Sequence, residues 1–372
     1  MIDFSLSAEQ HALVERSVAI FSASWSAERR EETEASATRF DRELWVELAD
    51  ADLLGVGIPL ELGGLGMGMT EMALVLREHG RSAALLPLWS TFIAGNAIAS
   101  LGSPELQGTW LPAIASGEAI LSVALESHAS AVDAIDDGDV LRVTGAQGAV
   151  PFWGVADAVL IPAFTDEGTV AVCIVDPTSS GVAAQVSETT NRELHATLTL
   201  DSVEVPKANV LDGRGLPTML ARAQVATSAI VLGAANEALH CTAVHTNQRE
   251  QFGRTLSSLQ AVSQRAADAL IDLQCMDATL WRAASNLDAA ADYLELPDDP
   301  SVAVAKWWAA TGGGRVVAAA QHLHGAAAAD LANPTYRHFL TVKQLQNALG
   351  GARQHQAAIG AHQGRTPNVE IA

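Results

Sequence analysis

Basic side chains are scarce in this sequence. Its 372 residues include 22 Lys and Arg against 43 Asp and Glu, which gives a formal net charge of −21 at pH 7. Proteins that bind nucleic acids present a basic stripe to the phosphates, and anionic membrane surfaces attract the same residue types. The charge therefore argues strongly against a nucleic-acid partner and also against binding at an anionic membrane surface.

Cysteine is also rare. Cys173, Cys241 and Cys275 are odd in number and far apart, so they give neither a disulfide framework nor the spacing of a metal site. The stretch from Met1 lacks the basic region of a signal peptide, and no uninterrupted apolar run reaches the ~18 residues that span a bilayer. The cysteine usage fits a cytoplasmic location. Because 49% of the residues are hydrophobic and only 17% are charged, we expect large buried or subunit-facing helical surfaces.

Residues 1–117 predict a helical domain. Ser7 and Gln10 form a capping box before an apolar stripe, and Phe40-Asp-Arg-Glu-Leu-Trp45 opens another helix. The glycines of Gly63-Gly-Leu-Gly66 lack the Lys and hydroxyl of a phosphate-binding loop and follow no strand, so they predict a tight turn between helices. Further helices are expected at Met69–Arg81, Leu88–Leu101 and Pro104–Ala115.

Residues 118–211 predict a small β domain, because the apolar period changes there from 3.6 to 2. Short strands without intervening helices indicate an antiparallel barrel or sandwich. The acidic run from Asp133 to Asp139 is interpreted as a solvated hairpin loop. The expected strands are Ile120–Leu125, Val140–Val143, Ala158–Pro162, Val170–Asp176, Val182–Val186 and Leu198–Val205.

Residues 212–372 predict an antiparallel four-helix bundle. Gly312-Gly-Gly-Arg315 is costly inside a helix, at about 1 kcal/mol per glycine, and therefore indicates a close approach by a helix or a ligand. The expected helices are Pro217–Thr246, Leu256–Leu294, Ser301–Leu323 and Tyr336–Gly360.

The corner between the first two bundle helices carries Arg249-x-x-Phe252-Gly253, with Gln260 shortly after, and Gly253 is expected to end the first helix. An Arg can bind a phosphate through its planar fork, a Phe can pack on a flat ring, and a Gln offers a donor and an acceptor. The corner therefore suits an anionic, partly aromatic ligand. A plain helix connection is the alternative for these residues taken alone.

Together these features resemble the acyl-CoA dehydrogenase family. A helical domain, a small β domain and a four-helix bundle follow one another in that family, and the resemblance covers essentially the whole chain. The motifs that carry it are Ile58-Pro-x-x-x-Gly-Gly-x-Gly, Val143-Thr-Gly-Ala-Gln, Arg249-x-x-Phe-Gly and Gln321-His-Leu-His324-Gly325.

The resemblance implies an enzyme whose FAD lies across a subunit interface. One subunit supplies the β domain against the flavin ring and a Glu that removes the α-proton of the acyl-CoA, and the other supplies two turns that hold the pyrophosphate and adenosine. The second turn of the family reads Gln-x-x-Gly-Gly. In this chain Gln321 lies one residue earlier than in that motif, and Ala326 replaces its second glycine. The residues implied to bind a neighbour's FAD are Arg249, Phe252, Gln260, Gln321, His324 and Gly325.

The catalytic base of the family has no counterpart here. One family position is a Glu-Gly-Thr-like turn late in the chain, but Leu331–Gly360 contains no acidic residue. The other position falls near Ala223, and Leu216–Asn236 contains none either. Glu237 and Glu250 are the nearest carboxylates, but their spacing does not match, so both are expected at the surface. We therefore predict no catalytic residue in this chain.

The loops expected to contact the flavin ring depart from the family as well. Leu125-Glu-Ser-His-Ala-Ser130 lacks the glycine of the family's Thr-Glu-x-x-x-Gly-Ser loop. Phe152 and Trp153 stand where the family has a small hydroxylated residue, and they are expected to crowd the ring. The half-site that this chain would use for its own flavin is thus degraded, whereas the half-site for a neighbour is mostly kept.

These departures predict an FAD-cradling, non-catalytic subunit of a heteromeric acyl-CoA dehydrogenase. Its partner in an α₂β₂ assembly would carry the Glu and bind the acyl-CoA. Phe40-Asp-Arg-Glu-Leu-Trp45 and the segment from Arg337 to Gly351 resemble base-lacking subunits of actinobacterial steroid degradation, which implies a cholesterol side-chain CoA thioester as the substrate. Two alternatives stay open: a homomeric flavoenzyme with a displaced base, and a flavin-free structural scaffold of the same fold.

Overall fold

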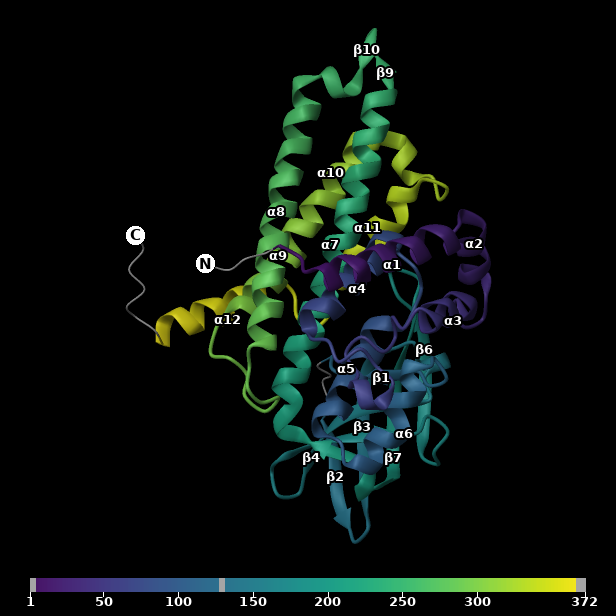
Figure 1. Cartoon of the computed structure of the whole chain (residues 1–372), viewed down its shortest axis with the longest axis vertical. Coiled ribbons are helices and arrows are strands. Elements are labelled where there is room, and N and C mark those ends of the chain that lie inside the picture. The colour runs from purple at the N-terminus through teal and green to yellow at the C-terminus, as the bar shows by residue number, and fades with distance from the viewer. Residues whose placement is uncertain (1–4, 127–130, 366–372) are drawn as a thin grey trace.

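The structure, a computed structural model, describes residues 5–126 and 131–365. Helices come first, an eight-stranded sheet follows, and long helices complete the chain (Figure 1). This arrangement confirms the predicted fold class, mainly α with a central β domain. The first group of helices comprises α1 (Ala8–Ser24), α2 (Ala27–Ala35), α3 (Arg42–Asp50), α4 (Met69–Ser82), α5 (Leu88–Leu101) and α6 (Pro104–Ala115).

Local sequence accounts for most of these helix starts. The Ser7 side chain accepts a hydrogen bond from the Gln10 backbone N–H, and the Gln10 side chain accepts one from the Ser7 N–H, so the capping box is confirmed. Asp41 caps α3 by accepting from the Leu44 N–H. Helix α2 was not predicted, because it has no apolar stripe. Ion pairs from its Arg29 to Asp41 and Glu47 anchor it instead.

The sheet is mixed, whereas the sequence predicted an antiparallel one. The strands are β1 (Leu121–Val123), β2 (Val132–Asp137), β3 (Val140–Pro151), β4 (Ala158–Thr165), β5 (Val170–Val175), β6 (Val182–Glu188), β7 (Leu194–Pro206) and β8 (Val210–Asp212). Their order is β6-β7-β3-β2-β4-β5-β8, and both β1 and β2 pair with β4 in parallel. The chain reverses between β2 and β3 and again before β4, so the first and third of these strands run the same way.

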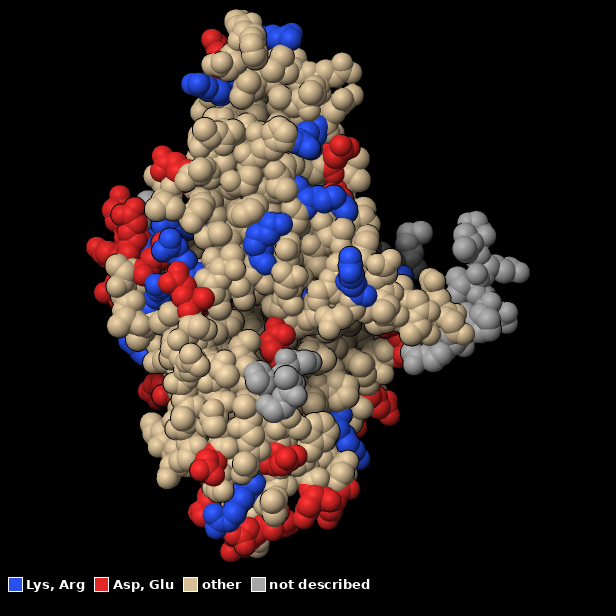
Figure 2. Space-filling view, turned by 180° about the vertical axis from the view of Figure 1, so that it is seen from behind, with Lys and Arg blue, Asp and Glu red and all other residues tan. Residues whose placement is uncertain are grey.

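The acidic run that was interpreted as a loop is largely strand β2. Its alternate residues Val132 and Ala134 are buried while Asp133 is exposed, which is the period of a strand with one face in the core and the other in solvent. The turn comes after it, at Gly138, where φ is +75°. Asp136 pairs with Lys207, and Asp and Glu side chains dominate this end of the molecule (Figure 2).

Helix α7 is the centre of the C-terminal part and contacts α4, α8, α10 and α11. By length and composition the helix Gly213–Gln248 could cross a membrane, although it contains no uninterrupted apolar run of that length, and 89% of its apolar window is buried inside the protein. It therefore serves as a core helix. The elements of this part are α7 (Leu216–Gln248), β9 (Glu250–Gln251), β10 (Arg254–Thr255), α8 (Gln260–Asp288), α9 (Ser301–Trp308), α10 (Gly314–His324), α11 (Pro334–Leu345) and α12 (Ala352–Arg365).

The third bundle helix contains the expected close approach. Between α9 and α10 the chain continues as a π-helical stretch, Ala309–Gly313. A Cβ atom at Gly313 would lie 2.6 Å from a methyl carbon of Val231 on α7, so a side chain there would collide with the core helix. The glycine cluster thus permits contact between two helices.

The fourth bundle helix is broken, whereas the sequence predicted one continuous helix. Helix α11 ends at Leu345 and α12 begins at Ala352. Between them Leu349 and Gly350 have φ of +55° and +102°, which no helix tolerates. Helix α12 consequently leaves the bundle, packs on α9 and projects from the body of the molecule (Figure 1).

Candidate functional site

The predicted ligand-binding corner is a hairpin at the far end of α7 and α8 (Figure 1). Helix α7 already ends at Gln248, so Gly253 does not end it, and Phe252 and Gly253 form the hairpin turn with φ of +57° and +74°. The Leu256 N–H donates to the Arg249 carbonyl and closes the loop. Phe252 is 90% exposed. An aromatic ring so exposed has no packing partner within its own chain.

Arg249 and Gln260 are placed by the same corner. Arg249 is the C-cap of α7 with extended backbone angles, and Gln260 is the first residue of α8. Both residues are exposed. Within the described residues Arg249 forms no ion pair, and both basic and acidic side chains lie at this end of the molecule (Figure 2). The structure therefore presents a guanidinium, a phenyl ring and an amide at one protruding tip.

The second predicted motif packs against the last turns of α7. The ring of His324 stacks on that of His245 with centroids 4.4 Å apart, and His245 lies one turn before Arg249. Burial lowers the pKa of His245, and His324 and Arg249 lower it further. The two motifs, far apart in sequence, thus meet at the same end of α7.

The three residues of this second motif differ in their exposure. His324 is buried and its Nδ1 lies 3.0 Å from the Ala320 carbonyl, so it positions α10 and has little surface for a ligand. Gln321 donates weakly, at 3.4 Å, to the Thr335 carbonyl. Gly325 is exposed, with φ of +62° at the end of α10. Gln321 and Gly325 are therefore the members available to a ligand.

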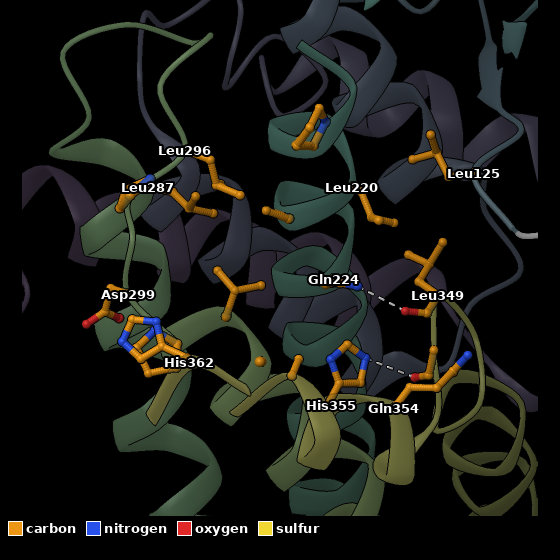
Figure 3. A pocket seen from close by; sticks show the side chains of 18 of the residues that line it. Leu125, Leu220, Gln224, Leu287, Leu296, Asp299, Leu349, Gln354, His355 and His362 are labelled. Atoms are coloured by element: carbon orange, nitrogen blue, oxygen red, sulfur yellow. Dashed lines mark hydrogen bonds between the residues drawn. The ribbon is translucent and has the colours of Figure 1, made fainter. Parts of the chain in front are cut away.

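A cavity of about 660 Å³ lies at the other half of α7 (Figure 3). Four segments that are distant in sequence enclose it: the end of β1, the first turns of α7, the link between α8 and α9, and the turn between α11 and α12. Its size is that of a small-molecule site. Its lining includes Leu125, Glu126, Leu220, Gln224, Leu296, Asp298, Asp299, Val302, Leu349 and His355.

Side chains fix the α11–α12 turn on one side of this cavity. The Leu349 N–H donates to Glu126 Oε1 at 2.6 Å, and its carbonyl accepts from Gln224 Nε2 at 3.0 Å. His355 Nε2 lies 3.2 Å from the Gly350 carbonyl (Figure 3). The two bonds to its backbone hold Leu349 in a left-handed conformation, with φ of +55°, that is unfavourable for a leucine.

Lys306 also stabilises the α11–α12 turn, from the protein interior. It is fully buried and donates to the Leu345 carbonyl at 2.8 Å and to Thr227 Oγ1 at 3.3 Å. Burial lowers its pKa to about 8, against the opposing effect of the Glu126 charge. Sequence reasoning named neither Gln224, His355 nor Lys306 as site residues, because only the folded chain brings them together.

The residues expected to crowd the flavin ring do not line this cavity. Phe152 is 1% exposed and Trp153 packs partly buried against the sheet core, and neither lines the cavity. Of the loop from Leu125 to Ser130, residues 127–130 lie outside the described residues. Glu126 is its one described acidic residue, and it points to the turn.

Family models match most of this architecture. The model described as "Acyl-CoA dehydrogenase, N-terminal domain" matches residues 7–118, and the one described as "Acyl-CoA dehydrogenase, C-terminal domain" matches residues 214–364. The chain belongs to the acyl-CoA dehydrogenase family. The resemblance predicted from the sequence is thus confirmed. Members of this family are FAD-dependent oxidoreductases.

Several related proteins align with more than nine-tenths of this chain. "Acyl-CoA dehydrogenase FadE27" of Mycobacterium tuberculosis is 38% identical over 91% of this chain and 93% of its own length. A chain of the ChsE4-ChsE5 complex from the same organism superposes with a TM-score of 0.93 at 36% identity, covering 98% of this chain and 100% of that one. A chain of a Tcur3481-Tcur3483 steroid ACAD variant gives 0.91 at 36% identity, covering 96% and 98%.

Proposed function

We propose that this chain is the FAD-cradling, non-catalytic subunit of a heteromeric acyl-CoA dehydrogenase. Similarity to chains of two complexes, ChsE4-ChsE5 and Tcur3481-Tcur3483, supports a second dehydrogenase subunit as the partner. The Tcur3481-Tcur3483 complex is described as a steroid acyl-CoA dehydrogenase, which supports a steroid-derived acyl-CoA as the substrate, bound in the partner's site. We place the complex in the cytoplasm.

The observation that carries the proposal is the side chain at residue 349. The α11–α12 turn reads Leu349-Gly350-Gly351 and borders the cavity, where the family resemblance implies a Glu-Gly-Thr turn with the base. The other implied position, Ala223, is a buried residue of α7. Removal of an α-proton needs a base within about 3 Å of it. The side chains of Leu349 and Ala223 cannot accept a proton, so neither residue can serve as this base.

The carboxylates that do line the cavity are already engaged. Glu126 accepts from the Leu349 N–H. Asp299 accepts a hydrogen bond from the Ser301 N–H at the start of α9, at 2.7 Å, and it pairs with Arg282. Asp298 contacts His362 at the rim. Each therefore has a structural role that competes with proton abstraction.

The residues at the α7–α8 tip fit the FAD that the family implies. The unpaired Arg249 guanidinium suits a pyrophosphate, the exposed Phe252 ring suits a flat partner, and the exposed Gly325 leaves room for close approach, since a Cβ there would meet nothing within 4 Å. When bound, the flavin supplies the hydride acceptor for dehydrogenation. This chain's part would be to bind and orient the pyrophosphate and adenosine of the partner's cofactor, with His324 positioning α10 beneath it.

Flavin absorbance tests the proposal. The chain purified alone should be colourless, and co-expression with a partner subunit that retains the Glu should give a yellow complex with one FAD per heterodimer. A yellow homo-oligomer with activity would overturn the proposal in favour of a homomeric enzyme. A complex that never binds flavin would leave only the structural scaffold.

One observation favours the homomeric enzyme as a second candidate. Glu126 places a carboxylate inside the chain's own cavity, so a displaced base would be this residue and neither Glu237 nor Glu250. Glu237 is not the surface residue that was expected, since it is partly buried and paired with Arg81, whereas Glu250 is exposed in β9. The two candidates differ in whether Glu126 is required for turnover.

A further inference from the structure

A second cavity, of about 260 Å³, lies between α1, α2, α4, α7 and the start of α11. It shares no lining residue with the cavity at the α11–α12 turn. Its apolar wall is formed by Phe21 and Trp25, which are 5% and 6% exposed, together with Val18. Trp25 Nε1 donates to the Ser82 carbonyl, so the polar atom of this indole is already satisfied. The wall therefore offers a ligand the exposed edges of these two rings and the partly exposed Val18 side chain.

The carboxylates of this cavity are neutralised from within the chain. Glu237 accepts from Arg81 Nε and Nη2 at 3.2 and 3.0 Å. Glu78, which is 3% exposed, accepts from Arg81 at 3.2 Å and from Arg77 at 2.9 Å. The Cys241 thiol also points to Glu237. Neither carboxylate is therefore free to compensate a further cation.

Arg30 is that further cation. Its guanidinium makes one hydrogen bond, from Nε to the Ser26 carbonyl at 3.4 Å, and no ion pair within the described residues. The nearby Glu34 is taken by Arg337. Burial lowers the pKa of Arg30 and repulsion from Arg337 lowers it further, while attraction to Glu34 opposes both effects. A partly buried cation that forms no ion pair with any described residue is unfavourable, and it is unexpected in a chain with 43 acidic and 22 basic residues.

We propose that this cavity binds a small organic carboxylate. The guanidinium of Arg30 would take the carboxylate through its planar fork, and the apolar body of the ligand would pack against Phe21 and Trp25. The volume of about 260 Å³ limits the ligand to a single ring or a short branched chain. The site is independent of the flavin and of the partner's substrate, because it uses neither the α7–α8 tip nor the cavity at Leu349.

Equilibrium dialysis of the full chain, with its partner where they form a complex, against radiolabelled benzoate at fixed ionic strength tests this. We expect one saturable site per chain. R30Q should weaken binding about ten- to hundredfold, the range of a charged hydrogen bond, and R30K should fall between because it keeps the charge without the fork. R142Q, on the sheet, should bind like the unaltered chain. Because Arg30 forms no ion pair with the described residues and only one long hydrogen bond, R30Q should not lower the thermal unfolding midpoint without ligand.

Several results would overturn the proposal. They are the absence of saturable benzoate binding, equal binding by R30Q, and saturable binding of inorganic phosphate that benzoate cannot displace. The last would show an oxyanion site without the apolar component. A fall in the ligand-free midpoint of R30Q would show that Arg30 has a partner within the chain, which also contradicts the proposal. Failure here would leave the flavin proposal untouched, since the tip residues are unaltered.

Discussion

Glu126, three residues after the first strand, accepts a 2.6 Å hydrogen bond from the backbone N–H of Leu349, although the two residues are 223 positions apart. Leu349 is 6% exposed and has φ of +55°. The bond thus fixes a turn that its own sequence does not favour, and it joins the β domain to the end of the bundle. Through this contact the carboxylate shapes the cavity wall.

This relationship predicts the effect of removing the carboxylate. E126A should leave the Leu349 N–H buried without an acceptor and lower the free energy of unfolding by about 1–3 kcal/mol. E126Q keeps an acceptor oxygen and should cost less. Urea denaturation measures both, with E204A on the exposed sheet surface as the control. Equal stability of E126A and E204A would contradict the role assigned to this bond.

Lys306 gives a prediction about pH. Its pKa in the folded chain is about 8, below the usual lysine value of 10.5, so the unfolded chain binds the proton more tightly between these values. Stability linked to Lys306 is therefore lowest below pH 8 and rises as the pH increases towards 10.5. K306M removes this titration. The stability difference between K306M and the unaltered chain should change across pH 8 to 10 in favour of the unaltered chain, and a constant difference would refute the depressed pKa.

The α7–α8 tip gives a prediction about cofactor binding. R249A should strip FAD from the complex, because loss of one partner of a desolvated charge pair costs roughly 3–5 kcal/mol. Arg254, in the same hairpin and exposed, provides the matched control, so R254A should keep the flavin. Absorbance of the flavin after gel filtration measures occupancy, and circular dichroism should show unchanged helix content. Full occupancy in R249A would remove this residue from the site.

The sequence predicted elements whose signals are local. The capping box at Ser7 and the bounds of α5 and α6 depend on near neighbours, and the structure confirms them. The missed elements depend on distant partners. Helix α2 is anchored through ion pairs of Arg29, and the break before α12 is held by Glu126 and Gln224. A leucine with positive φ has no sequence signature, so a continuous fourth helix was the natural but wrong prediction.

The same distinction applies to the sites. Arg249 and Phe252 sit on one tight corner, so their motif was readable from adjacent residues. The cavity at Leu349 is lined by segments more than 200 positions apart in the sequence, from Glu126 to His355. The periodicity of apolar residues does not indicate that such distant segments come together. Arg30 was likewise invisible, because its lack of a carboxylate partner is a property of the packed structure alone.

The last prediction concerns catalysis and separates the two candidate functions. If the partner supplies the base, replacing that Glu by Gln should abolish acyl-CoA dehydrogenation by the complex, while E126Q, E237Q and E250Q in this chain should change the rate little. E126Q is the decisive variant because it keeps the acceptor for the Leu349 N–H and removes only the capacity to take a proton. A positioned general base contributes about 10²-fold or more to the rate. Loss of that size in E126Q, with flavin occupancy unchanged, would place the base in this chain and make it a homomeric enzyme's own catalytic subunit.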